Sequence, residues 1–279
     1  MSEPVWPSRF WSALSTTDFA SVDAARAVAV LPVAATEQHG PHLPLGVDST
    51  LADGVVQASL PHLGADLPVL FLPTQTVGLS SEHTAFAGTL TLSPQTLISV
   101  WCELGACVAR AGFRKLVLFN AHGGNVAPMD IVARELRSAH QMIVYSTSWY
   151  TLPLGEAVDS LFDGDEHRFG IHGGAIETSM MLALAPDQVR MAQARDFESA
   201  SAQRARDFPI LGNGRSARLG WQMQDYHPEG AVGRASEATA GKGRALVEAA
   251  GRQLAALLAE VSALPLSTVR QPARSPGHD

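Results

Sequence analysis

The sequence is poor in cysteine and in clustered basic residues, and each shortage excludes a class of protein. Its 2 cysteines, Cys102 and Cys107, are too few for a disulfide framework and form no Cys-x-x-Cys metal or redox motif. We expect both to be core thiols in a reducing cytoplasm. The net charge of −7, from 20 basic and 27 acidic side chains without a Lys/Arg cluster, provides no basic surface. Nucleic acid and an anionic membrane are therefore not expected as partners.

Long apolar runs are also missing. Residues 1–14 are broken by Glu3, Pro4 and Arg9 and lack the continuous apolar core of a signal peptide. The longest apolar runs, such as residues 27–35, are far shorter than the roughly 20 residues that cross a bilayer. The sequence therefore predicts a cytoplasmic protein with no membrane partner.

Short β-branched apolar runs alternate with longer helical patterns along most of the chain. Strands are predicted at residues 26–33, 68–73, 115–120 and 141–146. Helices are predicted at residues 49–61, 93–111, 126–140, 171–184 and 239–264. This alternation is typical of a layered α/β fold with a mainly parallel β-sheet flanked by helices. We expect one domain over residues 1–264 and a flexible C-terminal tail over 265–279.

Two stretches show no such pattern. Residues 151–169 mix proline, glycine and acidic side chains, which predicts a long functional loop. Residues 195–237 are rich in Gly, Arg, Ser and Gln, which predicts extended loops or a peripheral subdomain rather than sheet.

Polar side chains follow the first predicted strand, where ligands bind in open α/β sheets. Glu37 and His39 are two residues apart and point the same way in an extended chain, and Asp48 returns at the start of the next helix. Carboxylates and imidazoles in this pattern suit a divalent metal. The alternative is that Asp48 only caps the helix and the other two are surface residues.

Three further segments carry candidate residues. His122 stands in Asn-Ala-His-Gly-Gly-Asn after another predicted strand, although a glycine-rich turn with an incidental histidine is the alternative. His172 is expected just before a helix and Glu177 inside it, where an unpaired carboxylate would be costly to bury. Residues 78–90 are predicted to form a rim loop, in which Glu82 and His83 either serve the site or merely pair with each other.

Taken in order, residues 36–48, 81–90, 120–125 and 177–179 resemble the motif set of the creatininase (creatinine amidohydrolase) family. The similarity runs over about residues 27–260. It implies a layered α/β hydrolase, usually a homohexamer, with two divalent ions per chain that are Zn and/or Mn. Fe also suits such ligands.

The resemblance also implies roles for individual residues. The metal ligands it implies are Glu37, His39, Asp48, His122 and Glu177, with Asp48 between the two ions. Catalysis is assigned to His172, as a proton shuttle, and to Glu177. We predict that Ser81, Glu82 and Trp149 bind the substrate, although Trp149 could instead be a core or interface residue.

Two departures narrow the expected activity. Creatininases have a glutamate two positions after the motif histidine, where this chain has Gly124, so creatinine itself is not the expected substrate. Ala175 stands where the family commonly has a glutamate, which removes one acid. We predict a metal-dependent amidohydrolase that cleaves a C–N bond of a small cyclic amide, formamide or related substrate. The alternatives are action on a peptide terminus or a sugar-derived ketone, or a noncatalytic metal-binding or assembly protein.

Overall fold

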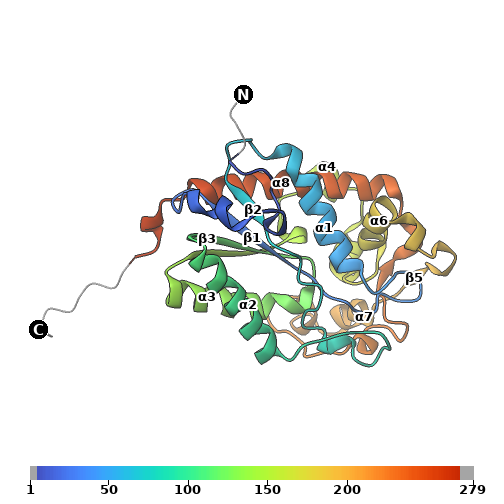
Figure 1. Cartoon of the computed structure of the whole chain (residues 1–279). Helices are drawn as coiled ribbons and strands as arrows, with labels where there is room; N and C mark the ends of the chain where they lie inside the picture. The colour runs from blue at the N-terminus through green and yellow to red at the C-terminus, as the bar shows by residue number, and fades with distance from the viewer. Residues whose placement is uncertain (1–4, 271–279) are drawn as a thin grey trace, which may run out of the picture.

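The computed structural model describes residues 5–270, and a four-stranded parallel sheet forms its centre (Figure 1). The strands lie in the order β2-β1-β3-β4. Their bounds are Val28–Val33 for β1, Val69–Phe71 for β2, Lys115–Asn120 for β3 and Ile143–Ser148 for β4. The predicted parallel sheet is confirmed, with β4 placed two residues later than its pattern indicates.

Helices cover both faces of the sheet and make three layers (Figure 1). One face carries α1 (Val47–Ser59), α6 (Ala175–Leu184) and α8 (Ala240–Ala263). The other carries α2 (Pro94–Arg110) and α3 (Val126–His140). Successive strand residues alternate between two separate apolar clusters, one under each helical layer. Strands buried on both faces explain why their sequences are apolar throughout.

A buried lysine fixes α8 to the sheet. The Nζ atom of Lys115, at the start of β3, donates hydrogen bonds to the carbonyl oxygens of Ser262 and Leu264, each at 2.6 Å. A cation at the C-terminal end of a helix also interacts favourably with the helix dipole. The C-terminal end of α8 is therefore held beside the start of β3, at the end of the sheet opposite the predicted site.

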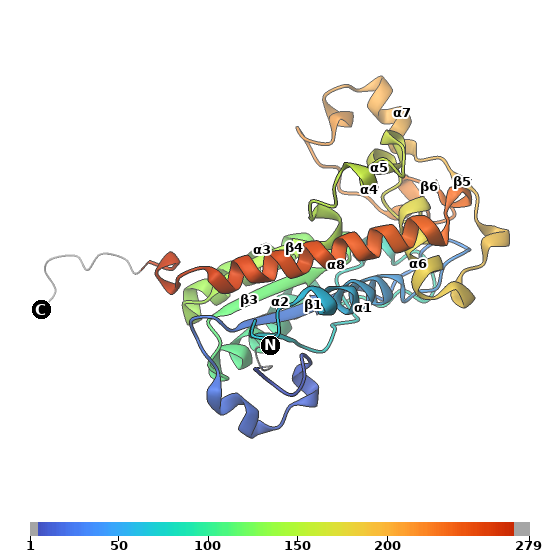
Figure 2. The ribbon, with the colours of Figure 1, turned by 90° about the horizontal axis from the view of Figure 1, so that it is seen from above.

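The two irregular stretches contain more structure than predicted. Residues 151–169 include α4 (Glu156–Asp159) and α5 (Gly164–Phe169), where Asp163 caps α5 by accepting from the Glu166 N–H group. Residues 195–237 include α7 (Ala200–Asp207) and an antiparallel pair of two-residue strands, β5 (Asp196–Phe197) and β6 (Gly233–Arg234). Figure 2 shows α5 and α7 projecting from the layered body.

Some smaller predictions need correction. Cys107 is exposed and Cys102 only partly buried, so they are not both core thiols. The predicted tail begins with an ordered 3-10 turn at Leu266–Thr268, and its residues 271–279 lie outside the described residues. Among residues 5–270, no helix is both long and apolar enough to span a membrane. The single domain over 1–264 stays a prediction.

Candidate metal centre

The polar side chains singled out in the sequence meet at the carboxyl ends of β1 and β3. Glu37 and His39 follow β1, His122 follows β3, and Asp48 and Glu177 come from the first turns of α1 and α6. The first four residues are at most 4% exposed, and the Glu177 side chain is 15% exposed. Parallel strands bring their carboxyl ends to one edge, which is why distant motifs converge there.

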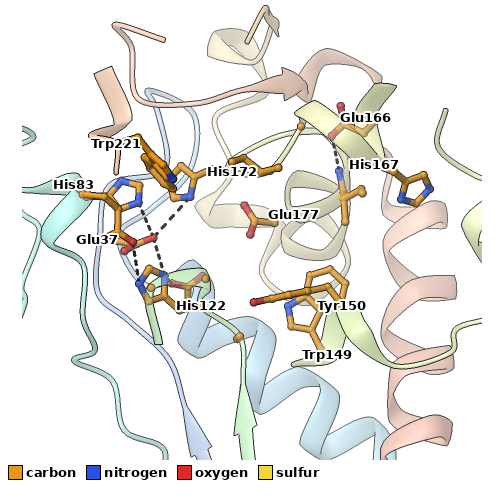
Figure 3. A pocket seen from close by; sticks show the side chains of 18 residues that line it. Glu37, His83, His122, Trp149, Tyr150, Glu166, His167, His172, Glu177 and Trp221 are labelled. Atoms are coloured by element: carbon orange, nitrogen blue, oxygen red, sulfur yellow. Dashed lines mark hydrogen bonds and ion pairs between the residues drawn. The ribbon is translucent and has the colours of Figure 1, made fainter. Parts of the chain in front are cut away.

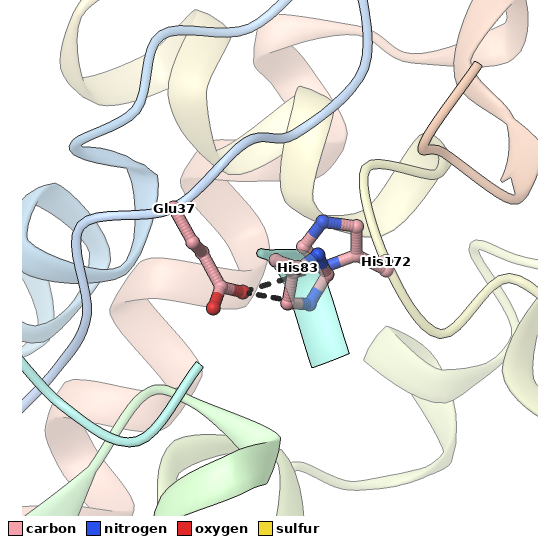
Figure 4. A group of neighbouring side chains, drawn as sticks. All are labelled: Glu37, His83 and His172. Carbon is pink, nitrogen blue, oxygen red and sulfur yellow. Dashed lines mark ion pairs between the residues drawn. The ribbon is translucent and has the colours of Figure 1, made fainter. Parts of the chain in front are cut away.

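Three imidazoles surround one carboxylate oxygen. Glu37 Oε1 lies 3.2 Å from His122 Nδ1, 3.3 Å from His83 Nε2 and 3.7 Å from His172 Nδ1. Figure 4 shows the last two rings facing this carboxylate. None of these contacts has the geometry of a hydrogen bond to Glu37.

Asp48 links this group to a second one. Its Oδ2 atom lies 3.5 Å from His122 Nδ1, whereas its Oδ1 atom lies 3.4 Å from His39 Nε2. Glu177 Oε2 lies 3.9 Å from the same His39 nitrogen. Each oxygen of Asp48 thus faces a different histidine.

Backbone carbonyl groups orient the two histidines. His39 Nδ1 lies 3.0 Å from the carbonyl oxygen of Glu37, and His122 Nε2 lies 2.7 Å from that of Leu79. A carbonyl oxygen can only accept, so we assign the N–H group to these nitrogens. The opposite nitrogen of each ring points toward the carboxylates, where a neutral ring would present its lone pair to a metal ion.

The centre holds buried polar atoms that have no hydrogen-bond partner. They are Glu37 Oε1 and Oε2, His39 Nε2 and Asp48 Oδ2. Unpaired buried polar atoms are costly, and their convergence on one place fits a bound cation. Triads of nearby ligand atoms include Glu37, His39 and Asp48, and also His39, His172 and Glu177. The residues therefore fit a divalent-metal site.

Charges inside the centre shift its protonation. Burial opposes charge on His39 and His122, but the neighbouring carboxylates outweigh it and raise the pKa of His39 to about 9 and of His122 to about 10. Burial, with Asp48 nearby, raises the pKa of Glu177 to about 7. Burial and the other imidazoles lower the pKa of His172 well below its ordinary value. In the absence of metal, protons on His39 and His122 balance the carboxylates.

A pocket of about 380 Å³ opens onto the centre. Glu82, Trp149 and His172 line it, as the sequence predicts. Ser81 does not: it is exposed outside the pocket lining, with its hydroxyl 3.4 Å from Glu82 Oε2. Figure 3 shows Trp221 beside His83 and His172, with Trp149 and Tyr150 across the pocket.

Sequence reasoning missed the partnership of Gln38 and His83. Gln38 Nε2 lies 2.7 Å from His83 Nδ1, and the Gln38 carbonyl oxygen accepts from His172 Nε2 at 2.7 Å. Gln38 therefore holds two histidines of the centre. The sequence gives no signal for this role, because in an extended chain the Gln38 side chain would point to the opposite side from Glu37 and His39.

Glu166 was missed as well. It lines the same pocket, and its carboxylate accepts from the N–H groups of Ala175 at 2.6 Å and Arg234 at 2.8 Å. It thus caps α6, the helix that carries Glu177. A carboxylate from α5 therefore stands at the start of α6, where Ala175 itself offers none.

The fold and the site together define an α/β protein with a polar, cation-binding pocket at the carboxyl edge of its sheet. The sequence profile of the family described as "Creatininase: Creatinine amidohydrolase" matches residues 12–258. The chain therefore belongs to the creatininase family of hydrolases.

The names of relatives within the family give different activities. The chain is 35% identical over 169 residues to a mycofactocin precursor peptide peptidase of Mycobacterium tuberculosis, a match that spans 58% of this chain and 60% of the relative. It is 33% identical over 204 residues to a creatinine amidohydrolase of Pseudomonas putida, across 68% of this chain and 77% of that one. A solved structure described as "Creatininase Mn" aligns with a TM-score of 0.71 at 28% identity, over 91% of this chain and 98% of the other.

Proposed function

We propose that this chain is a dinuclear metal-dependent hydrolase that cleaves a C–N bond of a small cyclic amide, formamide or related substrate. The observation that carries the proposal is the convergence of buried, unpartnered oxygen and nitrogen atoms of Glu37, His39 and Asp48 beside an open pocket, where His122 and Glu177 from two further motifs join them. Closed structural zinc sites lack such an opening, whereas catalytic sites keep one.

The donor set divides into two groups that share Asp48. Glu37, Asp48 and His122 would hold one ion, and His39, Asp48 and Glu177 the other. Carboxylate and imidazole ligands suit Zn and Mn, and Fe as well. The three ionised carboxylates carry −3 against +4 for two divalent ions, so the centre would be close to neutral with one hydroxide.

Divalent ions, when bound, supply an activated water and polarise the substrate carbonyl. The contribution of His172 is proton transfer. Its Nε2–H group is held by the Gln38 carbonyl oxygen, which leaves Nδ1 facing Glu37 Oε1 at 3.7 Å. A neutral ring with a lone pair on Nδ1 can accept the proton that the attacking water loses and pass it to the leaving nitrogen, which departs poorly as an anion.

The bond cleaved could also be at a peptide terminus, and one observation favours this second candidate. A relative with 35% identity is named as a peptidase. The pocket's aromatic walls, Trp149, Tyr150 and Trp221, suit a small ring or a peptide side chain equally well.

Metal analysis of the purified protein, followed by a substrate screen, tests the proposal. Two equivalents of Zn, Mn or Fe per chain and hydrolysis of a cyclic amide, formamide or small peptide would support it. Absence of metal, with no hydrolysis after Zn or Mn is added, would indicate the noncatalytic binding or assembly protein instead. A cytoplasmic location and a homohexamer stay predictions, and a monomeric mass in light scattering would contradict the hexamer.

A further inference from the structure

A second hollow adjoins the metal pocket, and it is lined by arginines. Its volume is about 390 Å³, and its lining includes Arg168, Arg204 and Arg218 together with Tyr226. No aspartate or glutamate lines it. This concentration of positive charge contrasts with the net charge of −7 of the whole chain.

The three arginines have no carboxylate partner within the described residues 5–270. Arg168 donates to the Gly212 carbonyl oxygen at 2.9 Å, and the Arg204 guanidinium lies 5.4 Å from the centre of the Tyr226 ring. Other arginines of the same projecting part do form ion pairs: Arg195 with Glu229, Arg206 with Glu198, and Arg234 with Asp163. Among the described residues, Arg168, Arg204 and Arg218 thus line the hollow without an ion pair, and the exposed Arg215, which lines neither cavity, is also without one.

Two side chains connect the hollow to the metal pocket. Ile171 and Trp221 line both cavities. The centre of the Trp221 ring lies 6.3 Å from that of His83 and 4.9 Å from that of Tyr226, and both contacts are edge-on. Figure 3 shows Trp221 next to His83 and His172. A molecule lying along Trp221 would therefore reach from the metal centre to the arginines.

The two cavities are lined by ionisable side chains of opposite kinds. The metal pocket is lined by five acidic residues, which are Glu37, Asp48, Glu82, Glu166 and Glu177. Bound divalent ions would neutralise Glu37, Asp48 and Glu177, but Glu82 and Glu166 would remain as carboxylates that repel an anionic group inside the metal pocket. Guanidinium groups recognise carboxylate and phosphate through paired, charge-assisted hydrogen bonds.

We infer that the substrate carries an anionic group, a carboxylate or a phosphate, at a distance from its scissile C–N bond, and that Arg168, Arg204 and Arg218 bind this group. The inference rests on the proposed hydrolysis for the position of the scissile bond. It narrows the substrate from amides in general to amides with an anionic end.

The test uses amides that differ only in their far end. One series consists of ω-amido carboxylic acids of increasing chain length, and the matched series consists of the corresponding neutral diamides. A third series ends in a phosphate monoester. Binding to the Mn-loaded protein is measured by calorimetry, and hydrolysis by product analysis. We expect an anionic series to bind at least about 10-fold tighter than the diamides.

Arginine variants test whether the hollow is the cause of the preference for anionic amides. Arg168→Gln, Arg204→Gln and Arg218→Gln should each reduce the preference severalfold and leave binding of the diamides unchanged. Arg215→Gln is the matched control, because Arg215 is exposed on the same segment and lines neither cavity. Circular dichroism and the Tm of each variant verify that it is folded.

The outcomes separate this inference from the proposed function. Equal binding of anionic and neutral amides would overturn the inference, and so would an anion preference that all three variants retain, since the metals would then bind the anion. Hydrolysis without any preference for anionic amides would support the proposed function and overturn the inference of an anion site. An arginine-dependent preference without hydrolysis would support the anion site and count against the proposed reaction. The series that is preferred identifies the anion as carboxylate or phosphate.

Discussion

Glu82 lies against Gly124, in the space that a side chain at position 124 would need. A Cβ atom on Gly124 would stand 2.6 Å from Glu82 Oε1 and 2.1 Å from the carbonyl oxygen of Leu79. The same Glu82 oxygen lies 3.7 Å from His122 Nε2. The absence of a side chain at Gly124 therefore lets a different segment bring its own carboxylate beside His122.

Gly124→Ala should consequently destabilise the protein and weaken metal binding. The added methyl group would push away the Leu79 carbonyl oxygen, which holds His122 in place, at a cost of about 1–3 kcal/mol in the free energy of unfolding. Gly123→Ala is the control, because a Cβ atom there would meet nothing within 4 Å. Urea unfolding and calorimetric titration with Mn²⁺ measure the two effects. Identical results for both variants would show that the contact at Gly124 is unimportant.

Removing a predicted ligand should remove the metal. Glu37→Ala or His122→Ala takes away a donor that faces the other ligands at about 3 Å, so both metal content and hydrolysis should fall to background. His62→Ala serves as the control, since His62 is exposed and only pairs with Glu248 at the surface. Elemental analysis after dialysis gives the metal content. Full metal content and activity in either ligand variant would refute the assigned centre.

Most of the layered fold could be predicted from the sequence, because strands buried on both faces are apolar throughout and helices carry their own caps. Ser93, for example, accepts from the Thr96 N–H group at the start of α2. The small β5–β6 pair could not be predicted from the sequence, since two-residue strands such as Asp196–Phe197 give no periodic signal.

The site was predictable where its residues stand within motifs at strand ends, as Glu37 and His122 do. Glu166 and Trp221 come from stretches without periodicity, and only the folded chain brings them to the pocket. The role of Gln38 was hidden for another reason, because an amide between two candidate ligands has no metal-binding chemistry of its own. Ser81 shows the converse error, since a polar residue beside Glu82 in a motif need not line the pocket.

Gln38→Leu should leave the metal ligands in place but destabilise the centre. The His83 Nδ1 atom would lose the amide that lies 2.7 Å away, and a buried group without its partner costs about 1–3 kcal/mol. Metal content should stay the same, because Gln38 is not among the assigned ligands. Gln95→Leu is the control, as Gln95 is exposed on α2. A loss of metal equal to that of the Glu37 variants would show that Gln38 acts on the ligands directly.

The metal-free protein should become less stable as pH rises above about 6.5. His39 and His122 have a folded-state pKa of about 9 and about 10, against an ordinary value of 6.5, so between these values the folded state binds more protons than the unfolded state. Their stabilisation is complete below pH 6.5 and is lost as pH approaches 9 to 10, by at most roughly 1.4 kcal/mol per pH unit for each histidine. The pKa of His83 is lowered to about 4 mainly by burial, so near pH 6.5 its unfolded state binds more protons than its folded state and adds a small opposite slope, which vanishes at higher pH.

Unfolding in urea with EDTA at a series of pH values from 6.5 to 9.5 measures this slope. Excess Zn²⁺ or Mn²⁺ should reverse it, because metal and protons compete for the same nitrogens and metal binding strengthens as protons leave. His122→Ala should remove the part of the slope that belongs to His122 and keep the part that belongs to His39. A flat profile in EDTA would mean that His39 and His122 are neutral in the metal-free protein, and a decline that persists in excess metal would mean that the ions bind elsewhere.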